Sequence, residues 1–402
     1  MKRPLADVKV LELARVLAGP WAGQLLADLG ADVIKVERPG SGDETRAWGP
    51  PFVSGPDGVQ GDAAYFHATN RGKRSITADL GSEEGRDVVR KLAQRCDVLI
   101  ENFKCGALAK FGLDQATLRA ANPHLIYCSI TGFGQTGPYA QRAGYDFIIQ
   151  GLSGLMDVTG MPDGPPVKGG VASADLFTGV YAVVGVLAAL RERDATGCGA
   201  YIDMSLLDVQ MSVLGNQALN FLVSGRTPQR LGNAHPNLAP YEVFAALGGD
   251  LIIAVGNDAQ FRRLCLVLGS ADLAGAVRFA TNAARVANRV ELSALIAART
   301  CERQRDRLIT ELEAAGVPAG PINSIAQAFA DPQVRARGMR LDLPAGNLAG
   351  GTLPGVRAPL VFDGVASFAA RRSPMLGEHT LEVLNELGAD APAETAKAAM
   401  HE

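Results

Sequence analysis

The chain has 402 residues, of which 47% are hydrophobic and 20% are charged, and its formal net charge is −3. A chain of this length exceeds what one typical hydrophobic core supports, so the sequence predicts two domains or one elaborated domain. The slightly acidic balance argues against a nucleic-acid-binding protein, which needs a basic excess.

The chain's start, its longest apolar run and its cysteines bear on where the protein works. The opening "MKRPLADVKVLELARVLAG" has no long apolar region before a cleavage site, so we expect no signal peptide. The apolar run 176–190 is too short to span ~30 Å of hydrocarbon as a helix, which predicts no membrane association. The six cysteines form no C-x-x-C pair. We interpret them as reduced thiols of a cytoplasmic protein without a metal site.

In the first half of the chain, β-rich runs alternate with helix-like stretches. The helix-like stretches are 21–30 and 81–95, and Ser82 is a candidate N-cap for the second. The β-rich runs are 8–13 ("VKVLEL"), 31–37 ("ADVIKVE"), 96–102 ("CDVLIEN") and 124–132 ("HLIYCSITG"). This alternation predicts an α/β fold with a parallel, Rossmann-like sheet, whose ligands bind beyond the carboxyl ends of the strands.

Two features resemble dinucleotide-binding signals but lack their context. The run "GFGQTG" (132–137) matches G-x-G-x-x-G, yet Pro138 follows it and no helix opens within it. Glu37 ends a strand where a ribose-binding acid would stand, but the first turn, 14–23, lacks the glycine spacing. Both observations argue against a nicotinamide cofactor.

The regular alternation of β-rich and helix-like stretches ends after the first half of the chain. We expect a large domain over 1–195, a linker over 196–228, and a smaller α+β domain over 229–325 with its own hairpin and helices. Residues 326–402 are expected to form a second linker and a C-terminal segment that returns to the large domain.

One carboxylate stands at the head of the apolar run. Asp175 is followed by fifteen uncharged residues. Local sequence leaves two interpretations open: Asp175 caps a buried helix, or it is a reacting group held at a helix N-terminus, where the helix dipole favours an anion. The neighbouring backbone N–H groups are candidate donors to a developing oxyanion.

Several blocks, taken together, resemble the class III CoA-transferase family, which includes formyl-CoA transferases, carnitine CoA-transferases and α-methylacyl-CoA racemases. The resemblance extends over nearly the whole chain, to "LGEHT" at 376–380. The blocks occur in the order "LELARVLAGPWAGQLLADLGADVIKVERPGSGDETRAWGPPF", "NRGKRSI", "ENFKCGAL", "YCSITGFGQTGPYAQRAGYDFIIQGLSGLM", "ASADLFTG" and "GNDAQF".

The resemblance implies a role for Asp175 and a set of CoA contacts. The family's catalytic aspartate falls in the block that matches "ADLFTG", so Asp175 would be the nucleophile that attacks an acyl-CoA thioester. Lys110 stands where many members carry Arg. A lysine can contact a phosphate but cannot bind it through two parallel hydrogen bonds as an arginine does. The implied CoA-contacting positions are Leu17, Ala18, Arg38, Ala78, Asp79, Asn102, Phe103, Lys110 and Tyr145.

Tyr145 bears on which activity of the family applies. Racemases of the family have His in "AGHD", whereas this chain has "AGYD" at 143–146. A tyrosine, with an ordinary pKa near ~10, is poorly suited to abstract a proton at neutral pH. The resemblance therefore favours a transferase; a core aromatic residue is the alternative interpretation of Tyr145.

The acid substrate is inferred from finer similarities. The glycine-rich loop of formyl-CoA transferases is replaced here by "GNAHPNLAPY" at 232–241, which argues against a formyl-CoA/oxalate enzyme. The stretches "GDETRAWGPPF" and "GVASADLFTGVYA" resemble the succinyl-CoA/dicarboxylate subgroup. A dicarboxylate needs a cation for its distal carboxylate, and Arg46 and Arg71 are the candidates. His235 is a further candidate substrate residue.

The resemblance also implies an assembly and leaves alternatives open. Family members form interlocked homodimers, in which the active site would lie between the large domain of one chain and the small domain of the other. The partners would be an acyl-CoA and a small carboxylic acid, with no metal. A racemase, a formyl-CoA/oxalate-type transferase and an inactive CoA-binding protein remain the alternatives.

Overall fold

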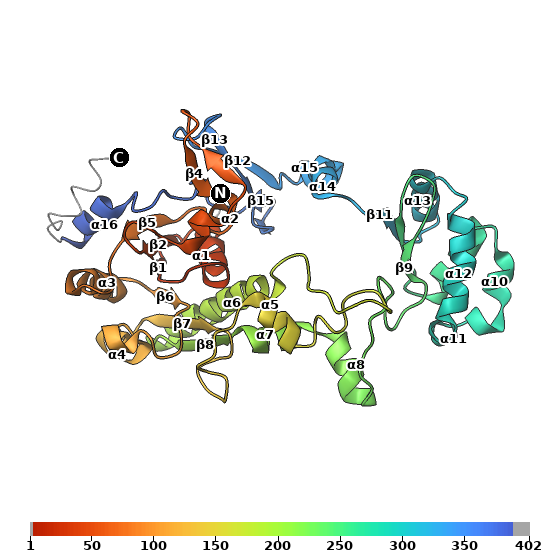
Figure 1. Cartoon of the computed structure of the whole chain (residues 1–402), viewed down its shortest axis with the longest axis horizontal. Helices are drawn as coiled ribbons and strands as arrows, with labels where there is room; N and C mark the ends of the chain where they lie inside the picture. Colours follow the sequence, from red (N-terminus) through yellow and green to blue (C-terminus); the bar gives the residue numbers. More distant parts are fainter. Residues whose placement is uncertain (1–2, 389–402) are drawn as a thin grey trace. The chain divides into compact units, whose positions relative to one another are not determined.

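The computed structural model describes residues 3–388 and divides them into two compact units. The large unit comprises 3–153, 170–218 and 333–388, and the second unit comprises 154–169 and 219–332. We describe each unit by itself; Figure 1 labels most of the helices and strands.

The large unit is built on a parallel sheet, as the alternating pattern predicts. Among the described residues the sheet has six strands in the order β5-β2-β1-β6-β7-β8, and every neighbouring pair is parallel. Renumbered along the chain this is 3-2-1-4-5-6, the order of a Rossmann fold. The strands are β1 (Lys9–Glu12), β2 (Asp32–Glu37), β5 (Arg74–Thr77), β6 (Val98–Glu101), β7 (Ile126–Thr131) and β8 (Tyr201–Ser205).

Helices cover both faces of this sheet, because strands with apolar side chains on both faces need cover on both. Ser82 caps α3 as expected, since its hydroxyl accepts the N–H of Gly85. The helices of the large unit are α1 (Ala18–Asp28), α2 (Ala64–Thr69), α3 (Glu83–Arg95), α4 (Gln115–Ala121), α5 (Asp146–Leu152), α6 (Ser173–Thr196), α7 (Leu206–Val213) and α16 (Thr380–Leu387), with the 3₁₀ turns η1 (Glu44–Ala47) and η2 (Ala109–Phe111).

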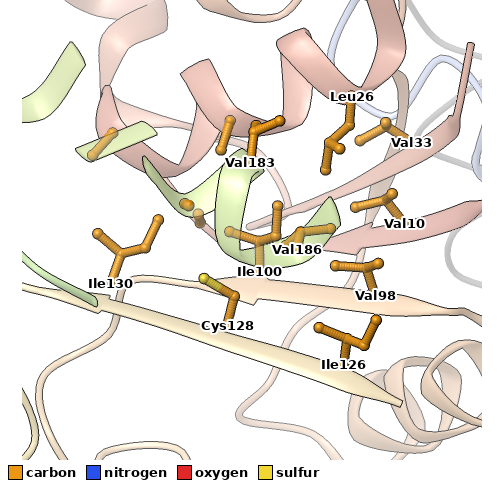
Figure 2. Close-up of a cluster of buried hydrophobic side chains, with 14 of the residues drawn as sticks. Val10, Leu26, Val33, Val98, Ile100, Ile126, Cys128, Ile130, Val183 and Val186 are labelled. Atoms are coloured by element: carbon orange, nitrogen blue, oxygen red, sulfur yellow. The ribbon is translucent and has the colours of Figure 1, made fainter. Parts of the chain in front are cut away.

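One hydrophobic core joins α1 and α6 to the sheet. Figure 2 shows Leu26 of α1 and Val183 of α6 above Val10, Val98 and Ile100 of the strands. These side chains are buried, and each contributes roughly 1.5–3 kcal/mol to folding by leaving water. A second core lies on the other face of the sheet, beneath α3, α4 and α16.

The long helix α6 has 24 residues, more than its apolar run alone indicates. By length and composition it is the one described helix that could cross a membrane. In the structure its buried face packs on α1 and the sheet as part of the core. Gly197, with φ of 74°, ends the helix in the left-handed conformation that glycine adopts without strain.

The segment after α6 belongs to the sheet and corrects the expected linker. Strand β8 pairs with β7 from Tyr127↔Tyr201 to Thr131↔Ser205, so residues 201–205 are the sixth strand of the large unit. The helix-like stretch that follows is broken at Gly215, which has φ of 54°. The sequence did not separate these elements because edge strand, turn and helix share one apolar composition.

The described part of the C-terminal segment packs on the large unit. Arg74 of β5 contacts Glu382 and Glu386 of α16 at 2.9 and 2.7 Å. The backbone N–H of His379 donates to the carbonyl of Ser75. The described residues of the large unit also form three two-stranded hairpins: β3 (Phe52–Ser54) with β4 (Gln60–Ala63), β12 (Arg340–Pro344) with β13 (Thr352–Val356), and β14 (Val361–Phe362) with β15 (Val365–Ala366).

The second unit has a small antiparallel sheet in the order β11-β10-β9, packed against helices around Phe261, Leu292 and Leu308. It includes 154–169, which the sequence assigned to the large domain. Its elements are β9 (Tyr241–Phe244), β10 (Leu251–Ala254), α9 (Asp258–Val267), α10 (Ala271–Gly275), η3 (Val277–Phe279), α11 (Asn282–Ala287), α12 (Arg289–Thr300), α13 (Arg305–Ala314), β11 (Ala319–Pro321) and α14 (Ile325–Ala330). Helices α8 (Asn216–Ser224) and α15 (Pro332–Ala336) lie at the two boundaries.

Candidate active site

The strand order reverses between β1 and β6, and ligands of Rossmann-like sheets bind beyond the carboxyl ends of the strands at that point. The two segments that follow these strands are joined there. Asn102 accepts the N–H of Arg15 at 2.9 Å and donates its side-chain amide to the Arg15 carbonyl at 2.7 Å. Leu17 and Ala18 follow directly and begin α1. The structure therefore brings Leu17, Ala18, Asn102 and Phe103 to one edge of the sheet.

An aromatic ring and a guanidinium group lie at the same edge. The Arg15 guanidinium stands 5.3 Å from the centre of the partly buried Phe103 ring. Arg15 also pairs with Glu44 at 2.5 Å, in a contact that is nearly half exposed on both sides. Such an exposed pair holds its partners weakly, so Arg15 remains available to a ligand.

The other expected CoA-contacting residues also follow strand ends. Arg38 is exposed directly after β2, and among described residues its side chain makes no hydrogen bond. Ala78 is buried after β5, and the exposed Asp79 accepts the N–H of Gly81 at 2.8 Å in the turn before α3. Lys110 is exposed on η2, with its ammonium 4.6 Å from the Phe111 ring centre. These residues line the same carboxyl edge of the sheet.

Asp175 is the third residue of α6 and does not cap it. The N-cap position is Ala172, which offers no side-chain acceptor. The cap comes from another helix: Asp146, the first residue of α5, accepts the N–H groups of Ala174 at 2.8 Å and of Asp175 at 3.3 Å. The capping interpretation of Asp175 is therefore wrong. The two N–H groups are also already engaged, which removes them as oxyanion donors in this arrangement.

The Asp175 carboxylate is held without a stabilising partner. Among described residues no hydrogen bond or ion pair reaches its oxygens. Burial, followed by the negative charge of Asp146, raises the pKa of Asp175 to about 7 from an ordinary 3.8. A half-buried carboxylate whose lone pairs are unengaged is chemically suited to attack an electrophilic carbonyl.

The helix that carries Asp175 lies close to the turn between β1 and α1. A Cβ on Gly179, one turn further along α6, would stand 2.7 Å from the Ala18 carbonyl, so α6 crosses the start of α1 at close range. Burial, followed by the negative charges of Asp175, Asp146 and Asp43, raises the pKa of the Tyr65 phenol in α2. Asp175 thus stands beside the turn that carries Leu17 and Ala18.

Tyr145 is the N-cap residue of α5, and 63% of its side chain is exposed. It is therefore not a core aromatic residue, the alternative interpretation from the sequence. It immediately precedes Asp146, whose carboxylate caps α6. The functional signal in "AGYD" that the sequence analysis missed is thus Asp146.

The two candidate arginines for a distal carboxylate are buried in ion pairs. Arg46 binds Glu37 through two hydrogen bonds of 2.8 and 2.6 Å and Asp62 at 2.5 Å. Arg71 binds Asp28 at 3.2 and 2.5 Å and the Val356 carbonyl at 2.8 Å. Both guanidinium groups are less than a tenth exposed, so the structure favours a role in packing over one in substrate binding.

His235 lies in the second unit. Its Nδ1 accepts the backbone N–H of Asn237 at 3.0 Å, and its ring contacts that of Tyr241 with 5.1 Å between centres. Burial and the nearby Arg289 lower the pKa of His235, so the ring is neutral at physiological pH. A role in substrate binding stays a prediction.

A buried charge network that the sequence analysis did not single out lies under the sheet edge. Glu12, Lys35 and Lys73 are each 0% exposed. Lys35 contacts Glu12 at 3.0 Å and Asp43 at 2.9 Å, and Lys73 contacts Glu12 at 2.7 Å. Burial, only partly offset by Glu12, lowers the pKa of Lys73 to about 8. The sequence signal for this network is Glu12 and Lys35, two charged side chains inside otherwise apolar strand runs; Lys73 stands just before β5.

No group of three or more His, Cys, Asp and Glu side chains that could hold a metal ion occurs within residues 3–388. Near the sheet edge, Asp43 and Glu37 pair with Lys35 and Arg46, and Glu101 accepts the backbone N–H of Phe103.

The family model for CoA-transferase family III matches residues 5–380. The chain belongs to CoA-transferase family III. This transferase is 59% identical over 386 residues to a succinate–glutarate CoA-transferase of Agrobacterium fabrum, covering 96% of each chain. It is 41% identical to the human succinyl-CoA:glutarate CoA-transferase, covering 96% of this chain and 86% of the relative.

Solved structures agree with the family assignment. A CaiB/BaiF family protein from Brucella suis is 56% identical and superposes with a TM-score of 0.85, covering 96% of this transferase and 100% of that protein. The expected family, enzyme class and α/β fold with a parallel sheet are thereby confirmed. As a CoA-transferase, the protein uses CoA thioesters as substrates.

The charge of Asp146 yields a testable prediction. We expect Asp146→Asn to move the acid limb of the pH–rate profile for CoA transfer downwards by about one pH unit. Asparagine keeps an acceptor oxygen for the Ala174 N–H but removes the negative charge that adds to the raised pKa of Asp175. Because the carboxylate is the reacting form, its fraction rises with pH through its pKa, and a lower pKa brings activity in at lower pH.

The measurement is kcat/KM from about pH 5 to about pH 9. Asp114→Asn is the matched control, because Asp114 also caps a helix, α4, through the N–H groups of Ala116 and Thr117. Its profile should stay in place. An unmoved or upward-moved profile for Asp146→Asn would show that Asp146 does not set the ionisation of Asp175.

Proposed function

We propose that this protein transfers CoA from succinyl-CoA to a small dicarboxylic acid, with glutarate as the first acceptor to test. The names of the relatives at 59% and 41% identity support this pair of substrates. The observation that carries the chemistry is Asp175, an unengaged carboxylate at the start of α6 beside the edge where a Rossmann-like sheet binds its ligand.

The proposed reaction proceeds through covalent intermediates on Asp175. The carboxylate attacks the succinyl thioester carbonyl, the C–S bond breaks, and a mixed anhydride and CoA thiolate form. The thiolate attacks the aspartyl carbonyl of the anhydride, which releases succinate and leaves an aspartyl-CoA thioester. Glutarate attacks that thioester, and the freed thiolate then attacks the glutaryl carbonyl to give glutaryl-CoA and restore Asp175.

The CoA contacts are proposed from the family positions and the observed edge. Leu17, Ala18, Asn102 and Phe103 would line the arm that delivers the thioester. Arg38 and Lys110 are exposed cations suited to the phosphates, and Ala78, Asp79 and Tyr145 complete the set. Arg46 and Arg71, the sequence candidates for the distal carboxylate of the acid, are not proposed to bind it, because their donors are occupied by Glu37 and Asp28.

We also propose the interlocked homodimer of the family, with His235 reaching the substrate from the small domain. An exposed apolar face on α6 supports a partner: Phe177, Val180, Tyr181 and Val184 are each more than 40% exposed. Larger exposed apolar patches mark association surfaces. Analytical ultracentrifugation should show a dimer at micromolar concentration; a monomer would contradict the assembly.

A cytoplasmic location is proposed because all six cysteines are free thiols.

The test is a matrix of donors and acceptors read by mass spectrometry. Succinyl-, acetyl-, formyl- and 2-methylacyl-CoA are each mixed with glutarate, mesaconate, citramalate and oxalate. We expect a new acyl-CoA from succinyl-CoA with a dicarboxylate of four carbons or more, and fastest with glutarate. Transfer restricted to formyl-CoA and oxalate would overturn the substrate assignment. Deuterium uptake at the α-carbon of 2-methylacyl-CoA without any transfer would make the protein a racemase.

A further inference from the structure

The turn between β1 and α1 contains a strained residue. Val16 has φ of 70°, in the left-handed region that β-branched residues avoid. Of the described residues other than glycine, only Val16 and Asp363 have positive φ. Strain of this kind persists only where the surroundings hold it in place, and it occurs preferentially at functional sites.

Side chains from distant segments bind the backbone of this turn. Lys35 of β2 donates to the Ala14 carbonyl at 2.8 Å. Asn102 binds both the N–H and the carbonyl of Arg15. Asp43, the N-cap of η1, accepts the N–H of Val16 at 3.2 Å. The turn is thus held by a strand, by the residue after another strand and by a loop, rather than by its own sequence.

The hydrogen bond from the Val16 N–H to Asp43 acts directly on the residue with the strained φ. Asp43 is in turn held in place by its own neighbours. Its carboxylate pairs with the fully buried Lys35 at 2.9 Å and accepts the N–H of Thr45 at 3.0 Å. Its backbone N–H donates to Glu37 at 2.9 Å. With 1% of its surface exposed, Asp43 has no alternative solvent position to which it can swing.

The direction of the chain after Val16 decides what faces Asp175. A change of φ at Val16 from the left-handed to the ordinary region would turn the following residues, Leu17 and Ala18. The Ala18 carbonyl already lies within close contact of α6 at Gly179, so the turn and the helix that carries Asp175 have a shared, tightly fitted boundary. A relaxed turn would not keep this boundary.

We propose that Asp43 and Lys35 are positioning residues for CoA transfer: their ion pair holds Val16 in the left-handed conformation that places Leu17 and Ala18 against the start of α6. The inference rests on the proposed function, because it assigns a purpose to the turn beside Asp175. It adds two residues that touch neither substrate, and it explains why a lysine and an aspartate are buried together beneath this edge.

The test is a rescue that depends on backbone conformation. Asp43→Ala removes the acceptor for the Val16 N–H, and we expect kcat/KM for succinyl-CoA to fall about tenfold or more, chiefly through KM. Val16→Gly in the Asp43→Ala background should restore most of this loss, because glycine adopts φ near 70° without strain. Val16→Ala in the same background should restore little, since alanine keeps the Cβ that disfavours that region.

The controls separate this proposal from loss of folding and from failure of the proposed function. Asp87→Ala, an exposed acid on α3, should leave kcat/KM unchanged. Affinity for free CoA, measured by calorimetry, should follow the same order in the variants whichever acid is the acceptor. If the wild-type protein binds CoA but transfers none, the proposed function is wrong. The CoA affinities of the variants still test whether Asp43 holds the turn at Val16.

Three results would overturn the proposal: Asp43→Ala retaining wild-type kcat/KM and affinity for CoA, equal rescue by Val16→Gly and Val16→Ala, or no rescue by either. If Asp43→Ala does not fold, Asp43→Asn takes its place. Asparagine offers one acceptor oxygen in place of the two that Lys35, Val16 and Thr45 share, so the same order of rescue is expected.

Discussion

Asp175→Ala is expected to reduce CoA transfer by about a thousandfold or more, the scale seen when a covalent nucleophile is removed. Without the carboxylate no mixed anhydride forms, and free glutarate must attack the thioester directly. The substitution should leave the fold intact, because no described residue bonds to the Asp175 side chain and α6 is capped by Asp146. The measurement is the steady-state rate with succinyl-CoA and glutarate.

Two comparisons make this result decisive. Asp114→Ala removes an acid from the start of another helix and should retain activity, although its cap is lost. Unchanged affinity of Asp175→Ala for CoA would show that the binding edge is intact while the chemistry is lost. An Asp175→Ala enzyme that keeps even a tenth of its turnover would contradict the mechanism.

Ionisation of the Asp175 carboxyl group is also expected to lower the free energy of unfolding. The pKa of Asp175 is about 7 in the native protein against an ordinary 3.8, so the native state holds the proton more tightly than the unfolded state. Stability therefore falls as pH rises through this interval and is constant above it. Asp175→Asn, which cannot ionise, should be more stable than wild type at pH ~8, on the order of 3 kcal/mol or less, and equal to it below pH ~4.

Lys35→Met is expected to destabilise the large unit by about 3–5 kcal/mol, the cost of breaking a buried ion pair by removing one partner. Burial alone would lower the pKa of Lys35, but the charges of Asp43 and Glu12 outweigh burial and raise it, so the lysine is a cation in the native protein. Its loss removes the ion pair of the buried Asp43 and leaves Glu12 paired with Lys73 alone. Urea unfolding measures the change.

Lys91→Met is the matched control for this prediction. Lys91 pairs with Asp87 at 2.8 Å on α3, where both side chains are 45% exposed. An exposed pair of this kind contributes about 0.3–0.5 kcal/mol. Similar losses for Lys35→Met and Lys91→Met would show that the buried network is not an important source of stability.

Local patterns located four of the six described strands of the parallel sheet, but they missed β5 and β8 and could not order the strands. The runs at 8–13, 31–37, 96–102 and 124–132 contain β1, β2, β6 and β7 to within two residues at each end. Alternation with helices implies parallel strands, and this was confirmed. The position of β8 depends on its pairing with β7, about 75 residues away. Local hydrophobic periodicity carries no information about such a distant pairing.

The site residues likewise divide into those that local sequence identifies and those that depend on contacts between distant segments. Asp175 could be singled out because it stands alone before an apolar run. The cap that Asp146 gives to α6 could not, because it joins residues 28 positions apart in different helices. Arg46 and Arg71 looked available in the sequence because their partners, Glu37 and Asp28, are 9 and 43 residues away and are buried beside them only after folding.

The most direct test of the account is the intact mass of the protein after rapid mixing with succinyl-CoA and acid quench. The mechanism predicts a covalent species heavier than the free protein by one CoA less one water, located on the peptide that contains Asp175. The adduct should vanish when glutarate is added and should not form in Asp175→Ala. Turnover without any adduct on Asp175, or an adduct that persists in Asp175→Ala, would contradict Asp175 as the group that carries CoA.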